Sequence, residues 1–216
     1  KTKEKGLKIS ADKYPYCTAN TDLDYILPSW VWAGGSSKEL ELLKDKSLRQ
    51  KILDELEEKY TPEFWENVIV CSVNKPQNYP LLGHSIAKCA SIKGIEPKEF
   101  VIELLIEEEL KVDAFYNLLS EENVQALYKL PFVFVASDAG NHPLRAHENS
   151  LAHPRAFGSF PEFLRKYVLN KHENLEKAIP KLTSKPAQKF GIKGRGLIRE
   201  GYFADLVILN IPKLQS

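Results

Sequence analysis

The chain alternates amphipathic stretches with short runs of β-branched residues, and this alternation is the feature that most restricts its fold. The runs 67–73 (NVIVCSV) and 131–138 (PFVFVASD) are short and apolar, which is typical of buried strands. Helical stretches precede and separate them. A helix followed by a buried strand, repeated along a chain, is typical of βα units with mainly parallel strands. The sequence therefore predicts an α/β protein with a mainly parallel sheet.

The helical stretches carry recognisable start and stop signals. Helices are expected over 36–60, 81–94, 96–110, 120–130, 160–169 and 174–191. Ser36 or Ser37 can cap the first helix, and Ser120 opens the fourth with an imperfect capping box. Gly94 is suited to end the second helix and Pro97 to begin the third.

The remaining segments are less regular. Residues 8–12 alternate polar and apolar side chains, as in a short strand. Residues 14–35 contain Pro and Gly at intervals, and we expect a structured loop there. Residues 194–210 resemble a β-hairpin built around Glu200 and Gly201. This hairpin does not fit the alternation, and it indicates the start of a small separate β module.

Composition excludes several classes of protein. The chain of 216 residues is 43% hydrophobic and 27% charged, as in ordinary globular proteins, and its net charge of +1 gives no basis for binding nucleic acid or an anionic membrane. No window approaches 18 consecutive apolar residues. Three cysteines without CxxC spacing argue against a disulfide framework or a cysteine zinc site, so a reducing cytoplasm is expected.

Both ends of the sequence suggest a piece of something longer. The chain contains no methionine, begins with KTKEKGLKIS and ends directly after a predicted strand. We expect these residues to continue on either side, the alternative being a self-contained domain.

Asp138 is the first candidate for catalysis. It follows directly after a predicted strand, and in parallel α/β proteins ligands bind at the carboxyl ends of the strands. There an aspartate can accept a proton from a metal-bound water, or ligate the metal itself. The alternative is an aspartate that caps a helix or accepts hydrogen bonds from loop amides. The residues alone leave both interpretations open.

The loop after Asp138 contains other candidates. His142, His147 and His153 are five and six residues apart, which is a weak metal-site signal because no HExxH helix is present. Arg145 and Arg155 can grip a carboxylate through two parallel hydrogen bonds, or simply form surface ion pairs. The sequence has no GxSxG elbow, Gly-rich phosphate loop or CxxC motif.

The chain contains several motifs in a fixed order: YPY (14–16), SD after a strand (137–138), HPR (153–155), GxFP (158–161), LTSxPAxxFG (182–191) and GYFADLV (201–207). Taken in this order, they resemble the C-terminal half of the N-acyl-D-amino-acid deacylases (D-aminoacylases) of the amidohydrolase superfamily. Each motif alone is weak, but their order along nearly the whole chain is specific.

The resemblance implies roles for individual residues. Asp138 matches the aspartate that takes the proton of the attacking water and passes it to the leaving amine. Arg155 matches the arginine that binds the substrate carboxylate, and Tyr14 matches a substrate-binding tyrosine. Asn20 falls where the family often has a small hydroxyl residue that also contacts this carboxylate, so the departure puts this contact in doubt. Pro180 interrupts a helix that the family usually continues, and a kink or a later start of the helix is expected there.

The resemblance also implies a fold and a cofactor. The expected fold is the C-terminal part of a (β/α)8 metal-dependent hydrolase barrel over 1–194, with an insertion at about 14–66 and strands of a small β-sandwich module over 195–216. Zinc is the expected cofactor, and the family's histidine pair, bridging cysteine and two later histidines are not matched in this chain. Asp138 is a weak candidate metal ligand.

These expectations define a function and its rivals. The chain is expected to act on a small N-acyl amino acid together with the missing N-terminal half of the barrel, and alone to bind no catalytic zinc and hydrolyse nothing. One rival is another amidohydrolase activity, such as cyclic amide hydrolysis, which would use Asp138 without needing Arg155. The other is a non-catalytic, amidohydrolase-like fragment.

Overall fold

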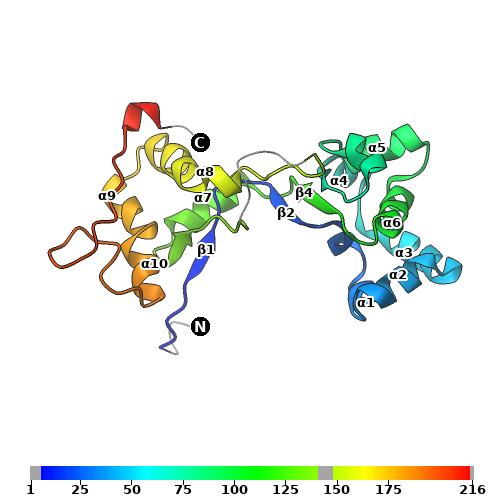
Figure 1. Ribbon diagram of the computed structural model, residues 1–216, viewed down its shortest axis with the longest axis horizontal. Helices are drawn as coiled ribbons and strands as arrows, with labels where there is room; N and C mark the ends of the chain where they lie inside the picture. The colour runs from blue at the N-terminus through cyan, green and yellow to red at the C-terminus, as the bar shows by residue number, and fades with distance from the viewer. Residues whose placement is uncertain (1–5, 141–147, 215–216) are drawn as a thin grey trace. The chain divides into compact units, whose positions relative to one another are not determined.

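The computed structural model describes residues 6–140 and 148–214, and its contacts divide the chain into two compact units (Figure 1). Unit 1 consists of Lys1–Cys17, Leu119–His142 and Pro154–Ser216, and unit 2 of Thr18–Leu118 and Pro143–His153. No helix among the described residues is long and apolar enough to cross a membrane.

Unit 1 is built on two parallel strands. Strand β1 (Ala11–Lys13) pairs with β5 (Val133–Val135), with Ala11 opposite Val133. The helical segments of this unit are α7 (Glu121–Lys129), α8 (Arg155–Glu162), the π-helical η4 (Phe163–Leu169), α9 (Leu175–Ala178), η5 (Ile179–Lys181), α10 (Ser184–Lys189) and η6 (Ile211–Lys213). Its core joins β5 to α7 and η4, with Val133, Tyr128 and Phe163 among the buried residues.

Unit 2 is built on an antiparallel sheet with the strand order β2-β4-β3. The strands are β2 (Ala19–Asp22), β4 (Asp113–Tyr116) and β3 (Val68–Ser72). Its helical segments are η2 (Leu23–Ile26), α1 (Ser29–Trp32), α2 (Ser36–Lys44), α3 (Lys46–Lys59), α4 (Pro62–Glu66), η3 (Pro76–Leu81), α5 (Ile86–Lys93) and α6 (Pro97–Glu107). They form the larger core with the sheet, and Ile52, Phe100 and Leu105 are fully buried in it.

Several local predictions are confirmed. Helix α5 ends at Gly94, which adopts a left-handed backbone, and Pro97 begins α6. The Ser120 hydroxyl accepts a hydrogen bond from the Asn123 amide and caps α7. The helix is interrupted at Pro180, as expected from a kink or a later start, because the 3-10 turn η5 separates α9 from α10 there.

Two predictions are wrong for unit 2: the mainly parallel sheet and the loop over 14–35. Residues 67–73 do form a strand, but it pairs antiparallel to β4, which the sequence did not predict. The supposed loop contains β2, η2 and α1. The expected helix over 36–60 is two helices, because Asp45 is extended and caps the second with its carboxylate. Neither Ser36 nor Ser37 caps the first helix, whose N-cap is Gly35.

The predicted terminal hairpin is only partly present. Gly201 has a left-handed backbone (φ 78°) and the Tyr202 amide donates to the Arg199 carbonyl, as expected for a turn. However, the described residues 195–210 contain no strand. A strand needs a neighbouring strand to which it is hydrogen-bonded. Val207 and Ile208 are 82% and 99% exposed, so no other element covers them in the described part of the chain. The β module and the barrel boundaries therefore stay predictions.

Candidate functional site

The site is positioned by the two parallel strands of unit 1. Tyr14 follows the last residue of β1, and Asp138 lies three residues after the end of β5. Because the strands are parallel neighbours, their carboxyl ends meet at one edge, and both side chains are delivered there. Asp138 adopts a left-handed backbone (φ 50°), which is uncommon outside glycine but tolerated by aspartate.

Arg155, the first residue of α8, completes the site. Its Nη1 lies 3.0 Å from Oδ2 of Asp138. The arginine side chain is only 11% exposed, whereas that of Asp138 is 65% exposed. The guanidinium is therefore held within unit 1, while the carboxylate remains accessible to small molecules. The structure brings together the two residues that the sequence singled out.

Tyr14 packs against the arginine of this pair. The guanidinium carbon of Arg155 lies 5.0 Å from the centroid of the Tyr14 ring, within cation–π range. Burial raises the pKa of the Tyr14 hydroxyl, and the charge of Arg155 opposes that increase. The phenol therefore stays protonated at neutral pH and can donate a hydrogen bond.

Lys13 belongs to the same cluster, and the sequence reasoning missed it. Its Nζ lies 3.3 Å from the Tyr14 ring centroid and donates to the Tyr16 carbonyl at 3.2 Å. The pKa of Lys13 is lowered to about 8, chiefly by burial and to a smaller extent by the charge of Arg155, while Cys17 and Asp138 oppose this. The sequence feature that could have identified Lys13 is its position at the end of a predicted strand, directly before the YPY motif.

The charges of this cluster suit an anionic ligand. Lys13 and Arg155 are cations and Asp138 is the carboxylate that faces them, so the cluster has one surplus positive charge at neutral pH. A substrate carboxylate would balance that charge, and a guanidinium binds carboxylates with well-defined geometry.

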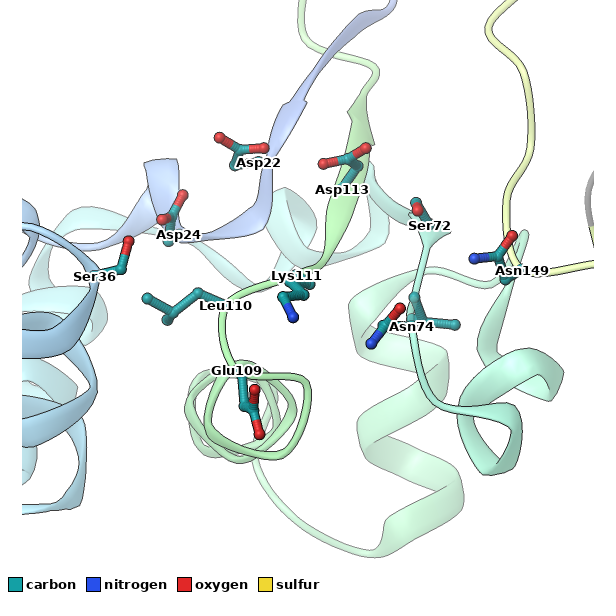
Figure 2. Close-up of a pocket in the computed structure, with 11 residues that line it drawn as sticks. Asp22, Asp24, Ser36, Ser72, Asn74, Glu109, Leu110, Lys111, Asp113 and Asn149 are labelled. Atoms are coloured by element: carbon teal, nitrogen blue, oxygen red, sulfur yellow. The ribbon is translucent and has the colours of Figure 1, made fainter. Parts of the chain in front are cut away.

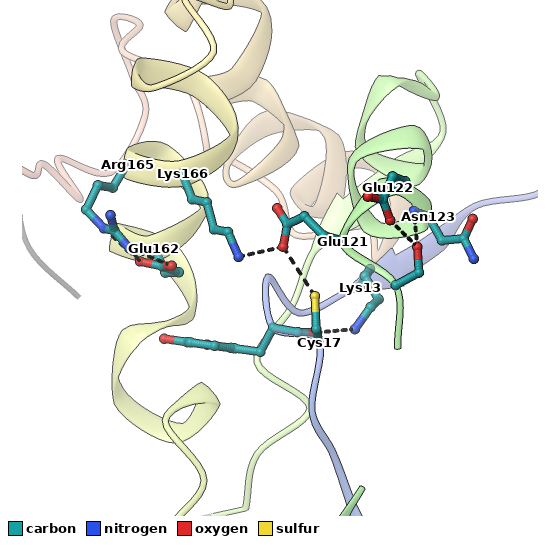
Figure 3. Close-up of polar contacts among 10 residues, drawn as sticks. Lys13, Cys17, Glu121, Glu122, Asn123, Glu162, Arg165 and Lys166 are labelled. Atoms are coloured by element: carbon teal, nitrogen blue, oxygen red, sulfur yellow. Dashed lines mark hydrogen bonds and ion pairs between the residues drawn. The ribbon is translucent and has the colours of Figure 1, made fainter. Parts of the chain in front are cut away.

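A second polar network fixes β1 beside α7 and η4 (Figure 3). The Cys17 thiol donates to Oε2 of Glu121 at 3.3 Å, and Nζ of Lys166 pairs with the same oxygen at 2.6 Å. The Tyr128 hydroxyl donates to the Lys13 carbonyl at 2.6 Å. These contacts hold the end of β1 in place, and burial raises the pKa of Cys17, so this thiol is a structural group.

The structure places Asn20 in unit 2. It lies on β2, and its side-chain amide donates to the Ala114 carbonyl and to Sγ of Cys71, both at 3.3 Å. These bonds orient the side chain within the antiparallel sheet. Its suggested contact with the substrate carboxylate remains a prediction.

The loop histidines do not form a metal site in the described part of the chain. His153 is 3% exposed, its Nε2 donates to the Thr18 carbonyl at 3.0 Å, and its ring packs edge-on against Phe115. His153 therefore has a structural role. His142, Arg145 and His147 lie outside the described residues.

A metal ion needs several donor groups that converge on one point. Among residues 6–140 and 148–214, no three His, Cys, Asp or Glu side chains are grouped so that they could hold a metal ion. The described residues thus do not fit a zinc centre by themselves. None of the three cysteines, Cys17, Cys71 and Cys89, forms a disulfide bond.

Comparison with solved structures defines the class of fold. An N-acyl-D-glutamate deacylase from Bordetella bronchiseptica, complexed with zinc and a phosphonate inhibitor, matches with a TM-score of 0.63 and 20% identity. A D-aminoacylase described as defining a novel subset of amidohydrolases matches with a TM-score of 0.62 and 24% identity. Each match covers 94% of this chain and 33% of the other. The chain has the α/β fold of one third of these amidohydrolases.

Curated relatives point to the same group of enzymes. The chain is 32% identical to a D-aminoacylase of Alcaligenes xylosoxydans xylosoxydans over 131 residues, which is 60% of this chain and 25% of that protein. An N-acyl-D-aspartate deacylase of the same organism is 33% identical over 54% of this chain and 24% of its own length. No family model matches. The resemblance to D-aminoacylases is confirmed, and the chain spans about a quarter of these relatives.

Proposed function

We propose that this chain is part of an enzyme that hydrolyses the amide bond of N-acyl-D-amino acids to a carboxylate and a D-amino acid. The observation that carries this proposal is the 3.0 Å pair of Arg155 and Asp138, placed with Tyr14 at the ends of two parallel strands. The curated relatives are deacylases of such substrates.

In this proposal each residue has one task. Arg155 binds the carboxylate of the substrate, and Tyr14 adds a polar contact to it. Asp138 accepts a proton from the water whose oxygen attacks the acyl carbon, and it returns the proton to the amine nitrogen as the carbon–nitrogen bond breaks. The surplus positive charge contributed by Lys13 favours an acidic substrate over a neutral amide.

The complete protein is proposed to contain a (β/α)8 barrel with zinc as its cofactor. One solved relative in the same fold group is complexed with zinc, and a mutant D-aminoacylase is in complex with CuCl2. The metal ligands are proposed to lie outside this chain, and Asp138 is at most an additional ligand. We assign no step of the reaction to the metal.

The test compares activity with and without the rest of the enzyme. The 216-residue chain alone is expected to show no turnover of N-acetyl-D-amino acids and no stoichiometric zinc by metal analysis. In the complete protein, Asp138→Asn should lower kcat by about 10²- to 10⁴-fold, the usual range for a lost acid–base group. Asp205→Asn, which alters a surface Arg–Asp pair of the same unit, is the matched control.

The outcomes separate the rival functions. Hydrolysis of cyclic amides that survives Arg155→Ala would favour another amidohydrolase activity. Complete protein that is inactive before and after Asp138→Asn would favour a non-catalytic relative. Zinc binding with turnover by the isolated chain would contradict the proposed division of the site.

A further inference from the structure

A second candidate site lies in unit 1, in a cavity of about 190 Å³ lined by residues of α7, η4, α9 and η5. Its floor consists of side chains that are at most 8% exposed, among them Tyr128, Phe163, Tyr167, Val168 and Lys181. Its rim is exposed and polar, and it includes Lys129, Glu173 and Lys177. The cavity is therefore a mainly apolar recess with one buried lysine in its floor and charged groups at its edge.

Lys181 is the observation that indicates a ligand. It lines the cavity, and its ammonium donates to the carbonyls of Leu130 at 2.5 Å and Val133 at 3.0 Å. Both acceptors are neutral, and no carboxylate pairs with this ammonium among the described residues. Burial, and to a smaller extent the charge of Lys185, lowers the pKa of Lys181. Buried charges in proteins are normally paired with an opposite charge, and an anion in the cavity would supply that counter-ion.

The other charges of the lining also favour an anion. Lys129 and Lys177 are exposed on the rim, and neither forms an ion pair in the part of the chain that the structure describes. Glu173 is the acid of the lining, so the lysines outnumber it by two charges. The cavity thus attracts an anion both at its floor and at its edge.

The larger cavity of the molecule, of about 530 Å³ in unit 2, has the opposite character (Figure 2). Asp22, Asp24 and Asp113 line it, and in Figure 2 their carboxylates lie on one side. Such a lining would repel an anion. An anionic ligand is therefore expected to distinguish the two cavities.

The aromatic floor favours a flat apolar body. The Tyr128 ring packs edge-on against Phe163, with centroids 4.7 Å apart, and is tilted against Tyr167 at 5.1 Å. Another ring can pack against such a wall edge-to-face or offset. The cavity is also smaller than the pockets of about 300–1,000 Å³ that hold drug-sized ligands, so it suits a molecule with a single ring.

We propose that this cavity binds a small aromatic carboxylate, whose ring packs against the aromatic floor and whose carboxylate balances the charge of Lys181 and the rim lysines. The Tyr128 hydroxyl donates to the Lys13 carbonyl, and Lys181 donates to the Val133 carbonyl, so the ligand would contact side chains that are bonded to β1 and β5. The lining shares no residue with the cluster of Arg155 and Asp138, and the proposal does not depend on deacylase activity.

The test is calorimetric titration of the 216-residue chain with sodium benzoate at pH 7 and constant ionic strength. Saturable binding is expected, whereas benzyl alcohol and benzylamine, which have the same ring without a negative charge, should not bind. Lys181→Met should weaken binding by about 10- to 100-fold, as for a lost hydrogen bond between charged groups. Lys177→Gln should weaken it by about 2- to 5-fold, as for an exposed ion pair. Lys189→Gln, which removes a lysine–carbonyl bond outside the cavity, is the matched control and should bind as the parent does.

The place of binding needs its own control, because Arg155 can also bind carboxylates. Arg155→Ala should leave the affinity for benzoate unchanged, and the methyl signals of Val168 should shift on titration in this variant as in the parent. Thermal unfolding establishes whether Lys181→Met is folded; Lys177→Gln changes an exposed side chain and tests the site in either case. No saturable binding, loss of binding in Arg155→Ala, or unchanged affinity in Lys177→Gln and Lys181→Met would overturn the proposal.

Discussion

The two units treat carboxylates in opposite ways. In unit 1 Asp138 faces the guanidinium of Arg155, and the surrounding charges sum to a positive surplus. In unit 2 Asp22 is the direct strand partner of Asp113, and burial together with the hydrogen bond and charge of Asp22 raises the pKa of Asp113 to about 6. The first arrangement is organised in advance for an anion, whereas the second would repel one. Charge balance, more than the presence of acidic residues, therefore distinguishes the candidate site of unit 1 from the paired aspartates of unit 2.

The largest effect is expected from a core substitution that acts on one unit. Phe100 is fully buried in unit 2, so Phe100→Ala should lower the free energy of unfolding by about 3–5 kcal/mol. Phe190 of unit 1 is 74% exposed, and Phe190→Ala should change the free energy of unfolding by less than about 0.5 kcal/mol. Denaturant unfolding measures both. Residue-resolved hydrogen exchange should show increased exchange in unit 2 alone; equal loss of protection around β5 would mean that the units unfold together.

The second largest effect is expected from a substitution of Arg155, which tests carboxylate binding in the complete protein. Arg155→Ala should raise KM for N-acyl-D-amino acids by about 10- to 100-fold, the range for a lost hydrogen bond between charged groups. The same change should leave KM for an uncharged amide analogue almost unaffected. Arg195→Ala removes a surface Arg–Asp pair of the same unit and is the control. Equal losses for charged and uncharged substrates would assign Arg155 to folding instead of carboxylate binding.

These two tests concern features that the sequence predicted unequally well. Gly94, Pro97 and Ser120 were interpreted correctly because the end of a helix depends on residues beside it in the chain. Strand pairing depends on distant residues: β1 and β5 are joined across more than a hundred positions, and the β2–β4 pair across ninety. Periodicity contains no information about those partners, so the antiparallel sheet of unit 2 was missed.

The candidate site likewise combines features that the sequence predicted with features that only the fold creates. Residue spacing left Asp138 and Arg155 open to structural interpretations, and it was the order of motifs that paired them. Lys13 was missed because its role comes from burial beside Tyr14 and from the nearby charges, which only the fold creates. The pairing of Asp22 with Asp113 was likewise not predicted, since the two residues become neighbours through a register that the sequence does not specify.

The third prediction uses pH to separate the units. The folded pKa values of Asp113 and Glu39, about 6 and about 7, lie above their ordinary values, so the folded state holds more protons than the unfolded state. Stability from these groups is complete below about pH 4 and is lost as the pH rises to 7. Asp113→Asn should flatten this decline between pH 4 and 6. Chemical unfolding at several pH values measures it, with exposed Asp54→Asn as control; an unchanged slope would contradict the assignment.

The smallest effects come from the helix caps, which offer one matched test in each unit. The Asp45 carboxylate accepts from the Ser47 and Leu48 amides at the start of α3, and the Ser120 hydroxyl caps α7. Replacing either residue by alanine should cost about 1 kcal/mol, because a helix amide loses its acceptor. Ser37→Ala should cost much less, since Ser37 makes no cap bond despite its position in the sequence. A cost for Ser37→Ala equal to that for Asp45→Ala would mean that α2 and α3 behave as the single helix expected from periodicity.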